Sequence, residues 1–159
     1  MRILGIDPGL SLTGYGCVDL NGAARSPKLV EAGVFRLRPR AAMAFRLQQL
    51  HDDLTALLDE LKPDLMVVEK LFSHYRQVRT AILMGHARGV ILQVGESRGI
   101  SIQELAVTEI KKAITGNGHA SKQQMQHAVM VQCGLRKPPS PPDVADAIAI
   151  ALCAARRME

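Results

Sequence analysis

The start of the chain consists of short apolar runs separated by turn residues, a pattern typical of strands. Residues 2–7 form a largely apolar run that ends at Pro8-Gly9, and residues 13–20 and 28–37 form two more. Asn21-Gly22, between the second and third runs, is a strong hairpin signal. The pattern therefore predicts three strands that pair antiparallel in sequence order.

From residue 42 the apolar positions take a helical period. Met43 and a series of leucines up to Leu61 predict an amphipathic helix over residues 42–61, which ends before Pro63. Residues 64–68 form a fourth strand ending at Glu69. The rest of the chain predicts a helix over about 77–97, a strand at 100–106, a short helix from Thr108 that Gly116-Asn117-Gly118 ends, a helix over 121–133 with a capping box of Ser121 and Gln124, and a last helix from about Asp143.

The order of these elements restricts the topology. A helical crossover from the third to the fourth strand is right-handed and lays the fourth strand parallel to a neighbour. That neighbour is the first strand, because the antiparallel meander already occupies its other edge. We expect one α/β domain over residues 1–159, with a mixed five-stranded sheet (a three-stranded meander plus parallel strands) flanked by helices.

Composition excludes several classes of protein. The longest apolar run, residues 147–155, is too short to span a membrane, and no signal peptide is visible. The three cysteines form no C-x-x-C pair, which argues against a zinc site and suits a reducing cytosol. We therefore expect a cytoplasmic protein with no membrane partner. The net charge of +5 favours a polyanionic partner without identifying it.

Four acids are predicted to meet at one place. Asp7 and Glu69 end strands that should be parallel neighbours, about 5 Å apart, at the edge where α/β sheets hold ligands. Asp143 and Asp146 share a face at the start of the last helix, although Asp143 alone is better explained as a helix cap than as a ligand. Carboxylates this close repel one another unless a cation joins them. Oxygen ligands indicate Mg²⁺ or Mn²⁺, and four negative charges balance two such ions.

Five segments, taken together, resemble the RuvC family of Holliday junction resolvases, in the same order over nearly the whole chain. They are GIDPGLSLTGYG (5–16), VVEKLF (67–72), ARGV (87–90), KKAITGNGHASKQQM (111–125) and DVADAIAIAL (143–152). One departure is Lys70, where the family commonly has an uncharged Gln. The resemblance implies an RNase H-like fold and a metal-dependent homodimer that cuts four-way junction DNA symmetrically, leaving 5′-phosphate and 3′-hydroxyl ends. It also implies a RuvA–RuvB branch-migration complex as a partner.

The resemblance assigns roles to particular residues. Asp7, Glu69, Asp143 and Asp146 match the family's catalytic, metal-binding acids. Phe72 matches a stacking residue, and the loop around it also carries three candidates for DNA contact: Tyr75, Arg76 and Arg79. Without the resemblance, Phe72 could equally be a core residue. For Tyr75, a structural role explains its presence as well as a DNA contact does.

Lys111 and Lys122 match basic residues that the family uses near the cleaved phosphate. Without the resemblance, each would be a solvated lysine on a helix. Gly85 and Gly89 lie four residues apart in the helix over 77–97, which permits a close approach to the sheet or to a second subunit.

Three other functions fit part of the pattern. The acids alone also suit a nuclease of the same fold that acts on RNA or an RNA–DNA hybrid. A junction-binding module that does not cut is a second alternative, against which the four intact acids argue. The segment from Ile6 to Gly14 also resembles the first phosphate loop of actin-like and sugar-kinase proteins, but those proteins need two lobes, and this chain has room for one.

Overall fold

The computed structural model describes residues 1–20, 26–71 and 77–158. In these ranges the chain forms, in order, β1 (Arg2–Asp7), β2 (Leu12–Asp19), β3 (Lys28–Arg36), α1 (Met43–Leu61), β4 (Leu65–Glu69), α2 (Val78–Ser97), β5 (Ser101–Leu105), α3 (Val107–Thr115), α4 (Lys122–Gln132) and α5 (Pro142–Arg156). Every element begins within one residue of the start predicted from the sequence. The predicted Asn21-Gly22 turn lies outside the described residues.

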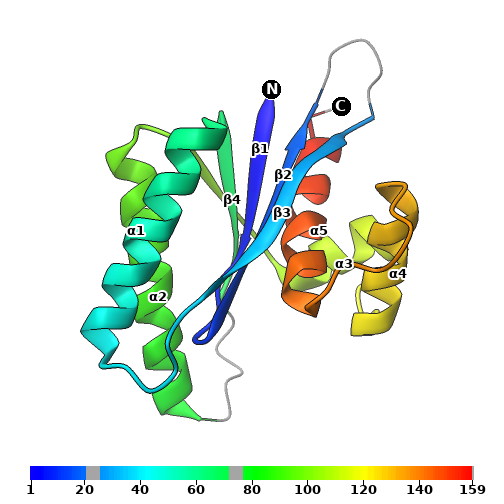
Figure 1. Ribbon diagram of the computed structural model, residues 1–159. Helices are drawn as coiled ribbons and strands as arrows, with labels where there is room; N and C mark the ends of the chain where they lie inside the picture. The colour runs from blue at the N-terminus through cyan, green and yellow to red at the C-terminus, as the bar shows by residue number, and fades with distance from the viewer. Residues whose placement is uncertain (21–25, 72–76, 159) are drawn as a thin grey trace.

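The strands form one mixed sheet in the order β3-β2-β1-β4-β5. β1, β2 and β3 pair antiparallel, whereas β4 runs parallel to both β1 and β5. Figure 1 shows α1 and α2 on one face of the sheet and α3, α4 and α5 on the other. The predicted meander, the parallel strands beside it and the flanking helices are therefore confirmed.

Two apolar cores fill the space between the sheet and its two helical layers. Ile3 and Val18 point to the layer of α5, while Leu4 and Ile6 point to the layer of α1 and α2. This division follows from the period of two along each strand. All four side chains are fully buried, so β1 is apolar on both faces until it reaches Asp7.

The backbone of α5 packs directly against the backbone of β1 and β2, because Gly5, Gly14 and Gly16 have no side chain to keep them apart. A Cβ atom added to Gly5 would lie 2.3 Å from the carbonyl oxygen of Ala147, and one added to Gly16 would lie 2.7 Å from the backbone of Ile148. Gly5 and Gly16 are direct partners across β1 and β2. No residue with a side chain fits at this contact unless the helix moves.

The glycines of α2 have a different environment. Gly85 and Gly89 are exposed, and a Cβ atom added to either would meet nothing within 4 Å. Of the two alternatives for these glycines, the close approach to the sheet is therefore wrong, and the approach to a second subunit stays a prediction. They lie instead on an open surface of α2 that also carries Val78, 74% exposed, and Ile82, 56% exposed. Across the described ranges, no helix has both the length and the apolar character that a bilayer crossing requires.

The two kinds of glycine predict opposite effects of alanine. Gly16→Ala should lower the free energy of unfolding by about 1–3 kcal/mol, because the new methyl group overpacks a contact with backbone. Gly85→Ala should raise it by up to about 1 kcal/mol, because alanine is the better helix former and space is open. Urea denaturation of the two variants and wild type measures both changes. Equal effects of the two substitutions would contradict the backbone contact of α5.

Candidate active site

The carboxyl ends of β1 and β4 place the first two acids side by side. Ile6 pairs with Val68, and the next residue on each parallel strand is an acid, Asp7 or Glu69. Asp7 lies two residues after Gly5 and pairs with Gly14 of β2. It therefore shares the face of the sheet that α5 covers.

The start of α5 reaches this pair through a further close contact. A Cβ atom added to Gly14 would lie 2.2 Å from the carbonyl oxygen of Asp143, so the first turn of α5 rests directly beside the strand partner of Asp7. Asp146 follows one turn later and faces the same place. The charges of both α5 aspartates act on the Asp7 carboxyl, which they could not do at long range.

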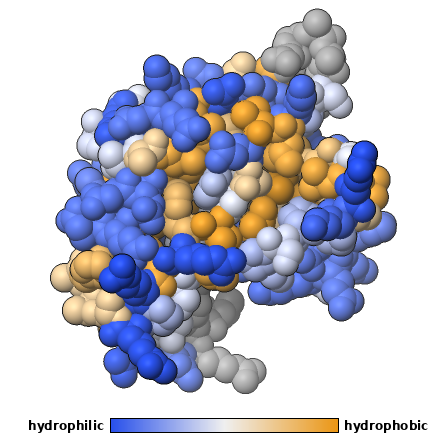
Figure 2. All heavy atoms as spheres, in the orientation of Figure 1, coloured by the Kyte–Doolittle hydropathy of each residue, from blue (hydrophilic) through white to orange (hydrophobic). Residues whose placement is uncertain are grey.

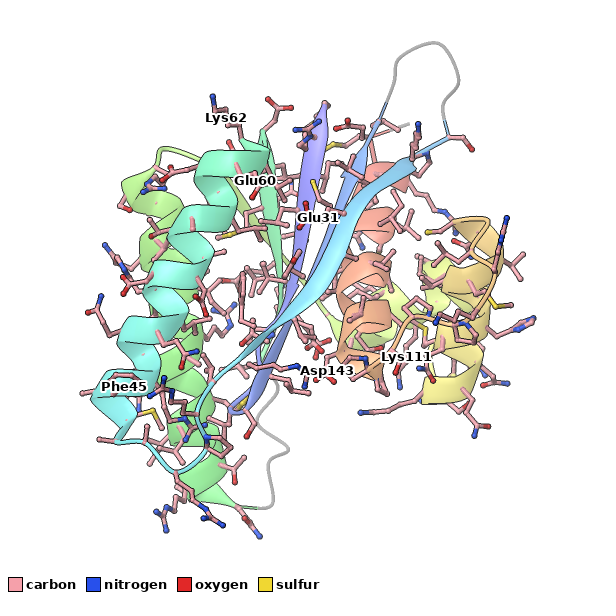
Figure 3. The ribbon with its side chains drawn as sticks, in the orientation of Figure 1. Glu31, Phe45, Glu60, Lys62, Lys111 and Asp143 are labelled. Carbon is pink, nitrogen blue, oxygen red and sulfur yellow. The ribbon has the colours of Figure 1, made fainter. Side chains whose placement is uncertain are left out.

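A pocket of about 240 Å³ opens at this edge of the sheet. Its lining combines carboxylates, two lysines and apolar side chains: Asp7, Glu69, Val107, Ile110, Lys111, Lys122, Met125 and Asp146. The pocket thus unites three of the four predicted acids with both predicted lysines. Asp143 lies beside the pocket and is not part of its lining; Figure 3 shows it at the same end of the molecule as Lys111.

Two short helices hold the lysines over the acids. Lys111 comes from α3, and Lys122 opens α4 after a turn in which Gly116 takes a left-handed conformation, with φ of 78°. The capping box predicted at the start of α4 is present: Ser121 and Gln124 exchange hydrogen bonds of 2.8 and 3.2 Å. Because these caps fix the turn between the helices, both ammonium groups are directed to one pocket.

The acids are held in an environment that disfavours their charged forms. Burial, followed by the charges of Glu69, Asp146 and Asp143, raises the pKa of Asp7 to about 8. Burial and the charge of Asp146 raise the pKa of Glu69 to about 7, although Lys111 and Lys122 oppose the shift. Burial also raises the pKa of Asp146. Burial and the repulsion between the acids therefore outweigh the opposing effect of the two lysines on these pKa values.

The loop that follows Asp7 is fixed by residues to which the sequence analysis gave no role. Thr13 is fully buried, and its hydroxyl lies 3.3 Å from the carbonyl oxygen of Gly9 and 3.4 Å from its amide nitrogen. A Cβ atom on Gly9 would meet the carbonyl oxygen of Leu12 at 1.8 Å. The signal for this loop was the Pro-Gly pair directly after an acid, with a hydroxyl four residues beyond the glycine.

Of the other predicted DNA-contact residues, Arg79 is the one that lies among the described residues. Arg79 is exposed in the first turn of α2 and is not part of the lining. Phe72, Tyr75 and Arg76 lie outside the described residues. The expected wedge beside Glu69 thus stays a prediction.

The donor chemistry of the pocket suits a hard divalent cation. Its acidic ligands are all carboxylate oxygens, and a bound cation would relieve the repulsion that raises the pKa values of Asp7 and Glu69. Among the described residues, however, no three His, Cys, Asp or Glu side chains are already close enough together to hold an ion. The acids thus line one pocket, but their carboxylates are not yet at the distances from one another that coordination of one ion requires.

Comparison with known proteins gives one consistent result. The family model described as Crossover junction endodeoxyribonuclease RuvC matches residues 3–154. A protein of that name from Rhodopirellula baltica is 48% identical over 153 residues, which cover 95% of this chain and 84% of the relative. The structure described as Thermus thermophilus RuvC in complex with Holliday junction substrate has a TM-score of 0.90 and 32% identity, and the match covers 99% of this chain and 96% of that one.

A more distant structure supports the fold alone. The yeast mitochondrial Holliday junction resolvase matches with a TM-score of 0.68 and 14% identity, over 97% of this chain and 78% of that one. The RNase H-like fold implied by the sequence segments is thereby confirmed. Since the family match spans nearly the whole chain and a relative is almost half identical to it, the chain belongs to the RuvC family of crossover junction endodeoxyribonucleases.

Proposed function

We propose that this chain is a divalent-metal-dependent endonuclease that resolves four-way DNA junctions in recombination and repair. The observation that carries the proposal is the pocket in which Asp7, Glu69 and Asp146 face Lys111 and Lys122. Two comparisons also support the proposed function: the match to the RuvC family, and the similarity to the Thermus thermophilus RuvC structure, which is described as a complex with Holliday junction substrate.

The basic and the acidic side chains of the pocket have different roles in this proposal. Lys111 and Lys122 bring positive charge to the position of the scissile phosphate and oppose the repulsion between that phosphate and the acids. Asp7, Glu69 and Asp146 hold the cation, with Asp143 as a fourth ligand at the pocket's side. Bound divalent ions, which we take to be two Mg²⁺ or Mn²⁺, supply an activated water and stabilise the leaving oxygen. The products would be 5′-phosphate and 3′-hydroxyl ends.

Symmetric cutting of two strands requires two active sites. We propose a homodimer in which the open surface of α2 around Val78, Ile82, Gly85 and Gly89 meets a second copy, because large apolar side chains are exposed there beside residues without side chains. A RuvA–RuvB complex as partner and base stacking by Phe72 belong to the same proposal and follow from the resemblance. A cytoplasmic location follows from the cysteine usage, and DNA contacts by Tyr75, Arg76 and Arg79 follow from their place in the aromatic, basic loop after Glu69.

The substrate distinguishes this function from its rivals. The protein should nick a synthetic four-way junction in Mg²⁺ at paired positions on two strands and leave a linear duplex of the same sequence and an RNA–DNA hybrid intact. EDTA should stop the reaction without preventing binding. Denaturing gels of end-labelled strands measure the products. Preferred cutting of the hybrid would replace this function with that of an RNA-directed nuclease, and binding without cutting would leave only a junction-binding module.

Neutralising an acid of the pocket should separate cleavage from binding. Asp7→Asn, Glu69→Gln and Asp146→Asn should each slow junction cleavage more than about 100-fold, since even residues that only support metal ligands cost that much. Junction affinity should stay near that of wild type, because it comes mostly from basic groups at phosphates. Asp143→Asn should have the smallest effect of the four acids. Single-turnover cleavage and gel-shift titrations measure the two quantities.

A matched control removes one negative charge away from the pocket. Glu96 is exposed near the end of α2, and Glu96→Gln should cut junctions at the wild-type rate. Near-normal nicking by Asp7→Asn would disprove the metal-binding role of the pocket.

The raised pKa values predict a stability that depends on pH and on metal. Folded Asp7, with a pKa of about 8, keeps a proton that the unfolded chain has released at its ordinary pKa. Wild-type stability should therefore fall as pH rises from about 4 toward about 8. In EDTA, Asp7→Asn should melt above wild type at about pH 8, and the gap should close toward about pH 4. At about pH 8, Mg²⁺ should narrow the gap by stabilising wild type.

Thermal melts of wild type, Asp7→Asn and Glu96→Gln, with EDTA or Mg²⁺, test this coupling. Glu96→Gln should follow wild type in all conditions. If Asp7→Asn melts below wild type at high pH in EDTA and Mg²⁺ stabilises neither protein, the acids do not form one metal-binding cluster.

A further inference from the structure

The connection between β3 and α1 carries a dense group of arginines that the proposed active site does not use. Residues 36–46, RLRPRAAMAFR, contain Arg36, Arg38, Arg40 and Arg46, and no acid occurs between Glu31 and Asp52. Arg36, Arg38 and Arg40 are exposed. We call residues 36–46 the arginine segment.

The arginine segment lies at the same edge of the sheet as the active site. β3 runs in the direction of β1, and the strand partner of Asp7, Gly14, pairs in turn with Val34, two residues before Arg36. Two strand spacings of about 4.8 Å and two residues of about 3.4 Å put the Cα atoms of Asp7 and Arg36 roughly 12 Å apart. Figure 3 shows Phe45, within the arginine segment, toward the end that carries Asp143 and Lys111, with Glu60 and Lys62 at the other end.

The backbone at the start of the arginine segment is hydrogen-bonded to the loop between β1 and β2 and to α1. Leu37 is buried, and its amide donates a hydrogen bond of 2.9 Å to the carbonyl oxygen of Ser11. The side chain of Gln49 in α1 donates one of 3.0 Å to the carbonyl oxygen of Arg36. The guanidinium of Arg38 lies over the ring of Phe45, 5.4 Å from its centre. The backbone at Arg36 and Leu37 and the side chain of Arg38 are thus already held in place, which reduces the entropy that they lose on binding.

The charges of the arginine segment are not neutralised within the described chain. Four other arginines, Arg2, Arg88, Arg98 and Arg157, each have a carboxylate oxygen at 2.6 to 3.0 Å. In the same set of described residues, Arg36, Arg38, Arg40 and Arg46 have no ion pair. The acids of α1 lie farther along that helix, from Asp52 to Glu60. Figure 2 shows strongly hydrophilic atoms at the lower left of the molecule, where Figure 1 places the β3–α1 connection.

We propose that the arginine segment binds the phosphate backbone of the duplex arm that leads into the active site. This rests on the proposed junction cleavage. Lys111 and Lys122 approach the pocket from the layer of α3 and α4, whereas the arginine segment flanks the same edge from β3 and α1. One duplex strand advances about 3.4 Å along its axis per phosphate, so the contacted phosphates lie within about four of the cleaved one. The repeated arginines suit a line of phosphates, because each guanidinium pairs with phosphate in a fixed fork geometry.

The test compares two double variants that lose equal charge. Arg38→Gln/Arg40→Gln removes two charges from the arginine segment, and Lys28→Gln/Lys62→Gln removes two exposed charges at the opposite edge of the sheet. Junction affinity is measured in EDTA over a range of salt. Each lost phosphate contact lowers the slope of log affinity against log salt by about 0.9, so the arginine variant should lose about 1 to 2 and the lysine variant close to none. Single-turnover cleavage with saturating enzyme should be unchanged in the lysine variant, whose two positions have no role in the proposed site.

A modified junction locates the contact on the DNA. Uncharged methylphosphonates replace the phosphates within about four of the cleavage site. Wild type and the arginine variant should bind this DNA with the same salt slope. The proposal would be overturned if the arginine variant kept the wild-type salt slope on normal DNA, or if the lysine variant lost as much slope as the arginine variant. It would also be overturned if the difference in slope between wild type and the arginine variant persisted on the modified junction.

Failure of the proposed function would look different, because wild type itself would then not prefer or cut junctions. The slope comparison is also run on the isolated duplex arm, which tests the arginine segment in that case as well.

Discussion

The direct contact between the backbone of α5 and strands β1 and β2 is the constraint on which the rest of the structure depends. Gly5, Gly14 and Gly16 leave no side chain between the helix and the sheet, and the buried positions of α5 are largely alanines that keep the approach close. The same contact sets where the helix begins relative to the strand ends. Because Gly14 is the partner of Asp7, packing of the helix on the sheet also brings Asp143 and Asp146 to the edge where Asp7 and Glu69 lie. The contact that packs α5 on the sheet therefore also places its two aspartates beside Asp7.

Close packing has an electrostatic consequence. The buried core brings acids together where water is scarce, and the raised pKa values of Asp7 and Glu69 report that cost in the folded protein without a cation. Lys111 and Lys122 reduce it but do not remove it, and no three ligands are already in place around an ion among the described residues. The apolar core thus holds these acids in position, and a divalent cation bound among them would reduce their mutual repulsion.

Sequence patterns predicted the elements and the sheet order because those depend on local periods and on the handedness of crossovers, both readable along one chain. They also placed Asp7, Glu69 and Asp146, since each ends or opens an apolar run. The glycines were harder to interpret. Gly85 and Gly89 suggested a close approach to the sheet that the structure does not contain, whereas Gly14 and Gly16, at the two-residue spacing of one strand face, make such an approach to α5. Spacing identifies a face without identifying what covers it. Thr13 was missed for the same reason, because its partner is a loop backbone.

Charge is distributed along the strand direction in a way that follows from these constraints. The carboxyl edge of the sheet holds the buried acids, the two lysines over them and the arginine segment beside them, whereas at the amino edge arginines such as Arg2 and Arg98 are neutralised by Asp19 and Asp59. Arg2 and Arg98 are paired, whereas Arg36, Arg38 and Arg40 have no ion pair among the described residues, so arginine charge that is free to attract a polyanion lies at the carboxyl edge. The acids of the pocket would repel a phosphate backbone, whereas Lys111, Lys122 and the arginine segment would attract it. The position of the basic side chains that have no ion pair among the described residues therefore decides which edge of the sheet a polyanion would approach.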